Sequence, residues 1–200
     1  MQHVHEHSSS PASAVPTGRQ GFAHPPRNVG VLGIDPGMTV ADFGSGSGVY
    51  VLLIADALQG SGHVYAVDIQ RDLLRRTANE ARQRGLNTVE VVWADLEKRN
   101  GSKLAPDTLD LVLISNLLFQ VEDKSAVLTE ARRVLRPKGR LVIIDWSDSF
   151  GGMGPQKRDV VTKDAALAFA QASGFTLHRE FDAGEHHYGL IFRQAPTTSV

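Results

Sequence analysis

Short apolar runs, separated by glycine, proline and polar residues, follow one another along most of the chain. Five of them are predicted to be strands: Thr39 to Phe43, His63 to Ile69, Thr88 to Trp93, Leu109 to Ser115 and Arg140 to Trp146. The central runs are almost continuously apolar, as is typical of strands that helices cover on both faces. The pattern therefore predicts a sheet at the centre of the molecule.

The segments between these runs have the length and apolar content of helices. Helices are predicted over about residues 28–34, 48–58, 70–84, 124–135 and 162–173. Thr162 is suited to cap the last of these helices, and Gly85 and Gly174 are suited to end two of them. Strands that alternate with helices indicate right-handed βαβ units and a parallel sheet.

The C-terminal end departs from this alternation. Two strands are predicted from Phe175 to Asp182 and from His187 to Gln194, and the short link 183–186 makes them an antiparallel pair. Glycine, proline and polar content predicts loops or turns in four other places. These are Pro25-Pro26, residues 95–108, Arg136 to Gly139, and Ser147 to Pro155.

A glycine-rich turn joins the first predicted strand to the helix after it. Residues 40–48 read Val-Ala-Asp-Phe-Gly-Ser-Gly-Ser-Gly, which is the pattern D-x-G-x-G-x-G. Glycines at alternate positions let the backbone approach a ligand closely, and the helix N-terminus points free N–H groups at it. A dinucleotide fingerprint would read G-x-G-x-x-G, but Val49 stands where its third glycine would fall.

This stretch resembles motif I of the class I S-adenosylmethionine (SAM)-dependent methyltransferases. The resemblance continues at Asp68, at Asp95 and at the strand ending in Ser115, and it covers roughly residues 27–195. It implies an α/β three-layer sandwich with a seven-stranded, mostly parallel sheet in the order 3-2-1-4-5-7-6 and a C-terminal antiparallel hairpin. It also implies SAM as cofactor and S-adenosylhomocysteine (SAH) as product.

In an open α/β sheet the ligand lies beyond the carboxyl ends of the strands. Asp68 ends the second strand, where a carboxylate can accept hydrogen bonds from both ribose hydroxyls of an adenosine group. The resemblance places Ile69 on the adenine face, Ala94 and Asp95 at the adenine edge, and the backbone of residues 115–116 beside the methionine part. The expected cofactor-binding residues are Asp42, Phe43, Gly44, Ser45, Gly46, Gly48, Asp68, Ile69, Ala94, Asp95, Ser115 and Asn116.

Two of the three acidic residues in this set also have other interpretations. Asp68 can act as a helix N-terminal charge near Arg71, and Asp95 can cap the turn that follows it. Asp42 lies inside a strand, where a carboxylate is costly unless it is hydrogen-bonded. By resemblance it fixes the glycine loop or contacts the methionine ammonium group. An acid suits a cationic cofactor, whereas it would repel the pyrophosphate of a dinucleotide.

Methyl transfer from a sulfonium requires mainly an acceptor held in line with the methyl group, so proximity and orientation supply most of the rate enhancement. An oxygen or nitrogen nucleophile can also need a general base. The candidates are Asp145, Asp123, His24 and His186, and each is more readily explained as a loop or capping residue. Several quinone and small-molecule methyltransferases carry His near the position of Phe119, which weakens any transfer of their substrate to this chain.

Composition narrows the range of partners. Lys and Arg number 21 against 22 Asp and Glu, for a formal net charge of −1, which argues against a polyanion recognised by bulk charge. Two basic clusters without interleaved aromatics read as solvated helix faces. They are Arg71, Arg75, Arg76, Arg82 and Arg84, and Arg132, Arg133, Arg136, Lys138 and Arg140.

The chain contains no Cys, which excludes a disulfide scaffold, a thiolate nucleophile and a cysteine metal site, and which fits the cytoplasm. No apolar run reaches ~18 residues, so no membrane span is expected. His3, His5 and His7 alternate near the N-terminus, but we interpret them as part of a polar tail, and no metal is predicted.

The predicted organisation is a disordered tail over residues 1–20, a methyltransferase domain over 21–195 and a short tail over 196–200. Within the domain, residues 21–38 are a candidate lid, with Phe22, His24 and Arg27 as lid residues or as simple packing. The loop 147–161 is expected to close over the substrate with them.

The predicted function is SAM-dependent methylation of a small or medium-sized acceptor by a monomer or homodimer. The alternatives are an RNA or protein methyltransferase, a non-catalytic SAM-binding module, and an NAD-type oxidoreductase.

Overall fold

A computed structural model of the chain describes residues 23–196. The predicted N-terminal tail, with its alternating histidines, and Phe22 lie outside these residues. So does the predicted C-terminal tail, apart from Pro196.

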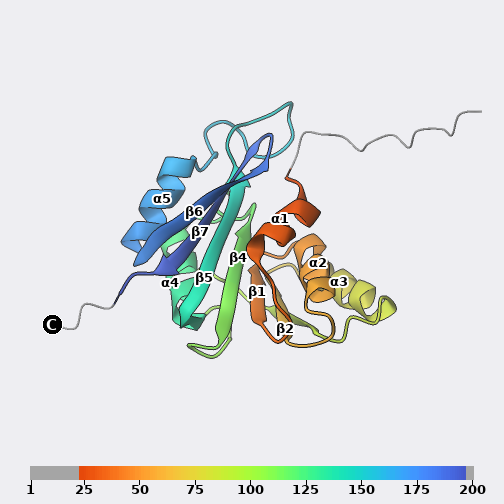
Figure 1. Ribbon diagram of the computed structural model, residues 1–200. Helices are drawn as coiled ribbons and strands as arrows, with labels where there is room; N and C mark the ends of the chain where they lie inside the picture. Colours follow the sequence, from red (N-terminus) through yellow and green to blue (C-terminus); the bar gives the residue numbers. More distant parts are fainter. Residues whose placement is uncertain (1–22, 197–200) are drawn as a thin grey trace, which may run out of the picture.

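One mixed sheet and five helices make up the described part of the chain (Figure 1). The helices are α1 (Pro25–Leu32), α2 (Val49–Ala57), α3 (Arg71–Gln83), α4 (Lys124–Val134) and α5 (Lys163–Ala172). The strands are β1 (Thr39–Phe43), β2 (His63–Asp68), β3 (Val89–Trp93), β4 (Leu109–Ser115), β5 (Leu135–Trp146), β6 (Phe175–Gly184) and β7 (His187–Gln194). Their order in the sheet is β3-β2-β1-β4-β5-β7-β6, and only β7 pairs antiparallel, with β5 and β6. The predicted fold class is confirmed.

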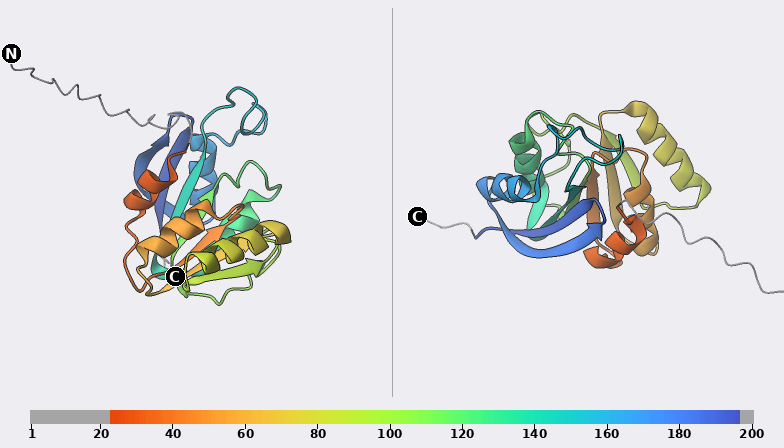
Figure 2. Two further views of the ribbon diagram at one scale, coloured as in Figure 1. Left: turned by 90° about the vertical axis from the view of Figure 1, so that its right-hand side faces the viewer. Right: turned by 90° about the horizontal axis from the view of Figure 1, so that it is seen from above.

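Helices cover both faces of the sheet, as Figures 1 and 2 show. Successive residues of a strand point to opposite faces. Val40 and Leu111 therefore pack in one apolar cluster with α1, α2 and α3. Ala41 and Val112 pack in a second cluster with α4 and α5. This two-sided burial explains why the central strands are apolar at nearly every position.

Three predicted boundaries are wrong. Pro25 and Pro26 open helix α1 instead of forming a turn before it, because proline suits the first helical positions, where its missing N–H costs nothing. β5 begins at Leu135, which pairs with Leu109 of β4. After an irregular stretch, regular pairing of the two strands resumes between Arg140 and Leu111. Residues 136–139, expected to be a turn, thus lie inside a bulged strand. β6 runs on to Gly184, which leaves a tighter link to β7 than predicted.

The carboxyl ends of the parallel strands lie along one edge of the sheet (Figure 1). The glycine turn after β1 and the loop between β4 and α4 begin at this edge. The loop 147–162 extends beyond it, and the start of α1 lies on the same side of the molecule. Residues that are far apart in the sequence therefore meet there, where the fold predicts a ligand.

Candidate active site

The glycine turn is held between two neighbouring elements. A Cβ atom on Gly48, whose φ is +78°, would lie 2.5 Å from the Thr77 side chain of α3. One on Gly44 would lie 2.7 Å from Leu117, in the loop after β4. Gly46 differs, because the nearest protein atom to its added Cβ is the Gly44 carbonyl oxygen at 4.0 Å. The outer glycines are thus required for packing, while the middle one leaves open space for a ligand.

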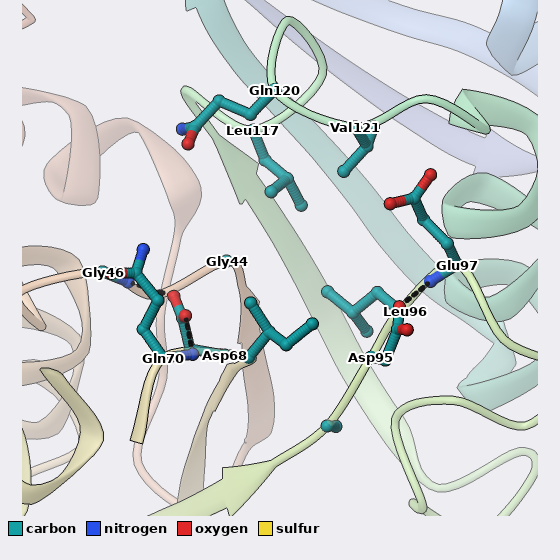
Figure 3. Close-up of a pocket in the computed structure, with 12 residues that line it drawn as sticks. Gly44, Gly46, Asp68, Gln70, Asp95, Leu96, Glu97, Leu117, Gln120 and Val121 are labelled. Carbon is teal, nitrogen blue, oxygen red and sulfur yellow. Dashed lines mark hydrogen bonds between the residues drawn. The ribbon is translucent and has the colours of Figure 1, made fainter. Parts of the chain in front are cut away.

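A first cavity of about 210 Å³ lies between this turn and the ends of β2 and β3 (Figure 3). Its walls mix backbone and carboxylate groups with apolar side chains. They are formed by Gly44, Gly46, Asp68, Ile69, Gln70, Ala94, Asp95, Leu96, Glu97, Leu117, Gln120 and Val121.

Asp68 is fixed at the edge of this cavity by both of its oxygens. Oδ2 accepts a hydrogen bond from the Gly46 N–H at 2.8 Å, and Oδ1 accepts one from the Gln70 N–H at 2.8 Å, as Figure 3 shows. Each carboxylate oxygen has a second lone pair, so the group can still accept hydrogen bonds from a ligand. The carboxylate also joins the glycine turn to the end of β2.

The rest of the first cavity suits a flat, largely apolar group. Ile69 is 58% exposed on its wall, and the buried Leu96 lines it as well. Asp95 lines the same cavity, and its Oδ1 accepts a hydrogen bond from the Glu97 N–H at 3.1 Å. Asp95 therefore caps its turn and faces the cavity at the same time.

A second cavity of about 370 Å³ adjoins the first along the glycine turn. Both are lined by Gly44, Gly46 and Gln120. The walls of the second cavity also contain Ala23, Pro25, Asp42, Ser45, Ser47, Val49, Tyr50, Ser115, Asn116, Trp146 and His187. Ala23 and Pro25 of the candidate lid segment thus form part of this wall.

Asp42 is the most unusual group in the second cavity. Its side chain is 2% exposed, and within residues 23–196 its Oδ1 has no hydrogen-bond partner. Burial is the larger cause that raises the pKa of this carboxyl to about 7, and the nearby charge of Asp68 contributes in the same direction. A cation bound beside Asp42 would favour its ionised form and would satisfy an oxygen that is otherwise costly to bury.

Three further side chains of this cavity were not among the predicted site residues. The Tyr50 hydroxyl accepts a hydrogen bond from Asn28 Nδ2 at 3.0 Å. His187 Nε2 lies 3.1 Å from Asn116 Oδ1, and the His187 ring lies 4.3 Å from the Trp146 ring. Only the pairing of β5 with β7 brings Trp146 and His187 together, so no local sequence signal indicates them.

Ten of the twelve residues expected to bind cofactor line one of the two cavities; Phe43 and Gly48 line neither. Phe43 is fully buried in the sheet, in the cluster that faces α4 and α5.

The four candidate general bases line neither cavity. Asp145 is fully buried, with its oxygens accepting hydrogen bonds from the N–H groups of Leu118 at 3.0 Å and Trp146 at 2.8 Å. Asp123 caps α4, His24 is exposed ahead of α1, and His186 contacts Asp148 at 2.9 Å. The lid candidate Arg27 forms an ion pair with Asp182 at 2.7 Å.

The two basic clusters lie on different parts of the molecule. The first lies on or directly after α3, where the Arg71 guanidinium stacks over the Trp93 ring at 3.8 Å. In the second, Arg136 pairs with Asp110 at 2.7 Å, where β5 begins. That end of β5 is opposite the edge that carries the cavities, so the clusters do not merge beside them.

Comparison with known proteins agrees with this geometry. A family model described as a methyltransferase domain matches residues 34–187, which include the glycine turn and the strand ends of both cavities. The chain belongs to the methyltransferase-domain family. The resemblance to class I SAM-dependent methyltransferases is thereby confirmed.

Relatives and solved structures extend the similarity. The chain is 29% identical over 167 residues to the ubiquinone/menaquinone biosynthesis C-methyltransferase UbiE of Shewanella sp. (strain W3-18-1). This match covers 76% of the chain but only 64% of the relative, which is less than two thirds of its length.

A SAM-dependent methyltransferase structure from Aquifex aeolicus superimposes with a TM-score of 0.78 at 25% identity, covering 86% of this chain and 90% of that one. A type 11 methyltransferase structure from Sulfolobus solfataricus, described as putative in its title, shares the fold with a TM-score of 0.70 at 20% identity, over 89% and 96% of the two chains.

Proposed function

We propose that the protein transfers a methyl group from SAM to a small or medium-sized acceptor. The observation that carries this proposal is the buried Asp42, whose Oδ1 has no partner in the described structure and which lines the cavity next to the glycine turn. SAM is cationic at its sulfonium and ammonium groups, and both suit a carboxylate. The pyrophosphate of NAD would be repelled there, which disfavours the oxidoreductase alternative.

In this proposal, bound SAM occupies both cavities. The adenosine part fits the first cavity, with its ribose hydroxyls on Asp68 and its adenine beside Ile69, Ala94 and Asp95. The methionine part fits along the glycine turn toward Asp42 and the backbone of residues 115–116. SAM supplies an activated methyl group when bound. The chain supplies binding, orientation and shielding from water, which is most of what an in-line displacement requires.

The acceptor is proposed to be a small molecule and not an RNA or a protein. The separation of the basic clusters supports this choice, because a polyanion would need them beside the cavities. The name of the UbiE relative points to ubiquinone and menaquinone biosynthesis. Phe119 stands near a position where several quinone methyltransferases carry His, which argues against transferring their substrate to this chain.

The cytoplasm remains our proposed location, and monomer or homodimer our proposed state. None of the helices in residues 25–172 is long and apolar enough to cross a membrane.

Calorimetric titration of SAH tests the cofactor assignment. We expect micromolar binding to the wild type and a loss of at least about 2 kcal/mol in Asp68→Ala, because a buried carboxylate that accepts ligand hydrogen bonds is removed. Asp72→Ala is the matched control, since Asp72 is an exposed acid in the first turn of α3. NAD is expected not to bind. Binding of NAD without SAH, or equal SAH binding by both variants, would refute the assignment.

A methyl-transfer assay with labelled SAM and a panel of small acceptors separates an enzyme from a non-catalytic SAM-binding module. We expect labelled product from at least one acceptor.

A further inference from the structure

Asn116 stands where β4 ends, on the wall of the second cavity. Its φ of 53° lies in the left-handed region, which Asn adopts more readily than most residues. Its N–H donates to the Ile144 carbonyl at 2.8 Å, and its carbonyl accepts from Gln120 Nε2 at 2.5 Å. Because its backbone N–H and carbonyl both make hydrogen bonds, the position of the Asn116 Cα atom is fixed.

The amide oxygen of Asn116 is also engaged. His187 Nε2 lies 3.1 Å from Asn116 Oδ1, and an amide oxygen can only accept, so Nε2 carries the proton. Burial lowers the pKa of His187 to about 4, helped by His186 and opposed by Asp148. The imidazole is therefore neutral near pH 7, and this hydrogen bond persists across the physiological range.

The remaining polar group of Asn116 is its side-chain NH2. Among residues 23–196, Nδ2 makes no hydrogen bond, while every other polar atom of the residue has a partner. An amide whose oxygen is held by His187 presents its nitrogen on the other side. Two N–H donors are thus available to whatever occupies the second cavity.

The surroundings of this donor indicate what it can bind. The aromatic rings of Tyr50 and Trp146 line the cavity and favour a flat ligand. Among the described lining residues there is no Lys or Arg, so an oxygen of the ligand would meet a neutral donor. Asp42 is the only acid among the lining residues within 23–196, and the proposed function assigns its carboxyl to the cationic cofactor.

We propose that Asn116 orients the methyl acceptor by donating a hydrogen bond from its side-chain NH2 to an oxygen of the acceptor, and that His187 positions the amide for this contact. The inference rests on the proposed function, because it needs an acceptor next to bound SAM. The acceptor class is a flat molecule with a phenolate, enolate or carbonyl oxygen beside the reacting atom. A protonated amine, which offers only donors, does not fit.

Binding of 4-nitrophenolate to the SAH complex at pH 8 tests this contact, with nitrobenzene as the probe that lacks the oxygen anion. We expect Asn116→Asp to weaken 4-nitrophenolate at least about tenfold, because a carboxylate replaces the donor while still accepting from His187. Nitrobenzene should bind the SAH-saturated forms of both proteins within about threefold, and a cooperative urea unfolding transition like that of the wild type shows that the variant is folded. Unchanged 4-nitrophenolate affinity in Asn116→Asp, or no binding of this probe to the wild-type complex, would overturn the proposal.

A second pair of variants tests the positioning role of His187. His187→Gln keeps an N–H donor for the Asn116 oxygen, whereas His187→Leu removes it. We expect the Leu variant to lose several-fold in 4-nitrophenolate affinity and the Gln variant to recover most of it. Equal loss in both variants would contradict the role. If the wild type did not bind SAH, the proposed function would be refuted. If it bound SAH but not 4-nitrophenolate, only the role of Asn116 would be refuted.

Discussion

Asp42 is the most deeply buried acid among the described residues that line the two cavities. Its pKa of about 7 in the folded chain lies above the ordinary value of 3.8 because burial opposes ionisation and Asp68 is also acidic. A group whose pKa rises on folding stabilises the fold fully below its unfolded pKa. That stabilisation is lost as the pH rises through the folded pKa.

The free protein should therefore lose stability between about pH 4 and pH 7 through Asp42, and Asp42→Asn should remove that loss. From urea unfolding we expect the variant to be about 2–4 kcal/mol more stable than the wild type at pH 8 but not at pH 4. Burial also raises the pKa of Asp145 to about 7, but that residue titrates in both proteins and cancels in the comparison. A difference in stability that is independent of pH would contradict the account.

At the same scale, some site residues were predictable from the sequence and others were not. Asp68 and the glycine turn are local signals, because a strand end and spaced glycines can be recognised within a few residues. Asn116 and His187 lie 71 residues apart in the chain, and their contact depends on the pairing of β7 with β5. No local pattern indicates this contact, so only a backbone role was predictable for Asn116, and His187 was not among the predicted site residues.

At the scale of elements, the loop between β4 and α4 is held by Asp145 at the end of β5. The carboxylate accepts from the N–H of Leu118, and the neighbours Leu117 and Gln120 line the cavities. Asp145 was a candidate base because it lies at the end of the fifth predicted strand, near the expected site. Its side chain is fully buried in the structure, which favours a role in fixing the loop.

Asp145→Ala should release that loop. We expect a loss of roughly 2–4 kcal/mol in the free energy of unfolding, since two buried N–H groups lose their acceptor. We also expect faster hydrogen exchange over residues 117–121 and weaker SAH binding. Asp164→Ala, which alters an exposed acid in the first turn of α5, serves as the control. Unchanged exchange over residues 117–121 would show that Asp145 does not hold the loop.

Apolar patterning was sufficient to predict the strands, because burial on both faces makes their runs continuous. It did not predict where β5 begins. The bulge between Leu109 and Leu111 lets residues 136–139 continue the strand despite Pro137 and Gly139, and that tolerance depends on the partner strand. The turn predicted at Pro25-Pro26 was wrong because proline is common both in turns and at the first positions of a helix, so the residue type alone does not distinguish them.

On the scale of the whole molecule, segments from seven parts of the chain meet at one edge of the sheet. The start of α1, the glycine turn, and the segments that follow β2, β3 and β4 supply most of both cavities, and Trp146 and His187 complete the second. This gathering is a consequence of the strand order, which places the first and fourth strands side by side at the centre. The position of the site was therefore predictable from the fold class. The side chains that β5 and β7 contribute to the second cavity were not.

We propose that SAM lies across both cavities, with its adenosine in the first and its methyl group in the second. Nuclear Overhauser contacts from SAM carrying a ¹³C-labelled methyl group measure this orientation directly. We expect the methyl protons to contact the rings of Tyr50 or Trp146, and the adenine protons to contact the methyl groups of Ile69 or Leu96. Adenine contacts with Tyr50 or Trp146 would contradict the claim, as would a methyl group near Ile69.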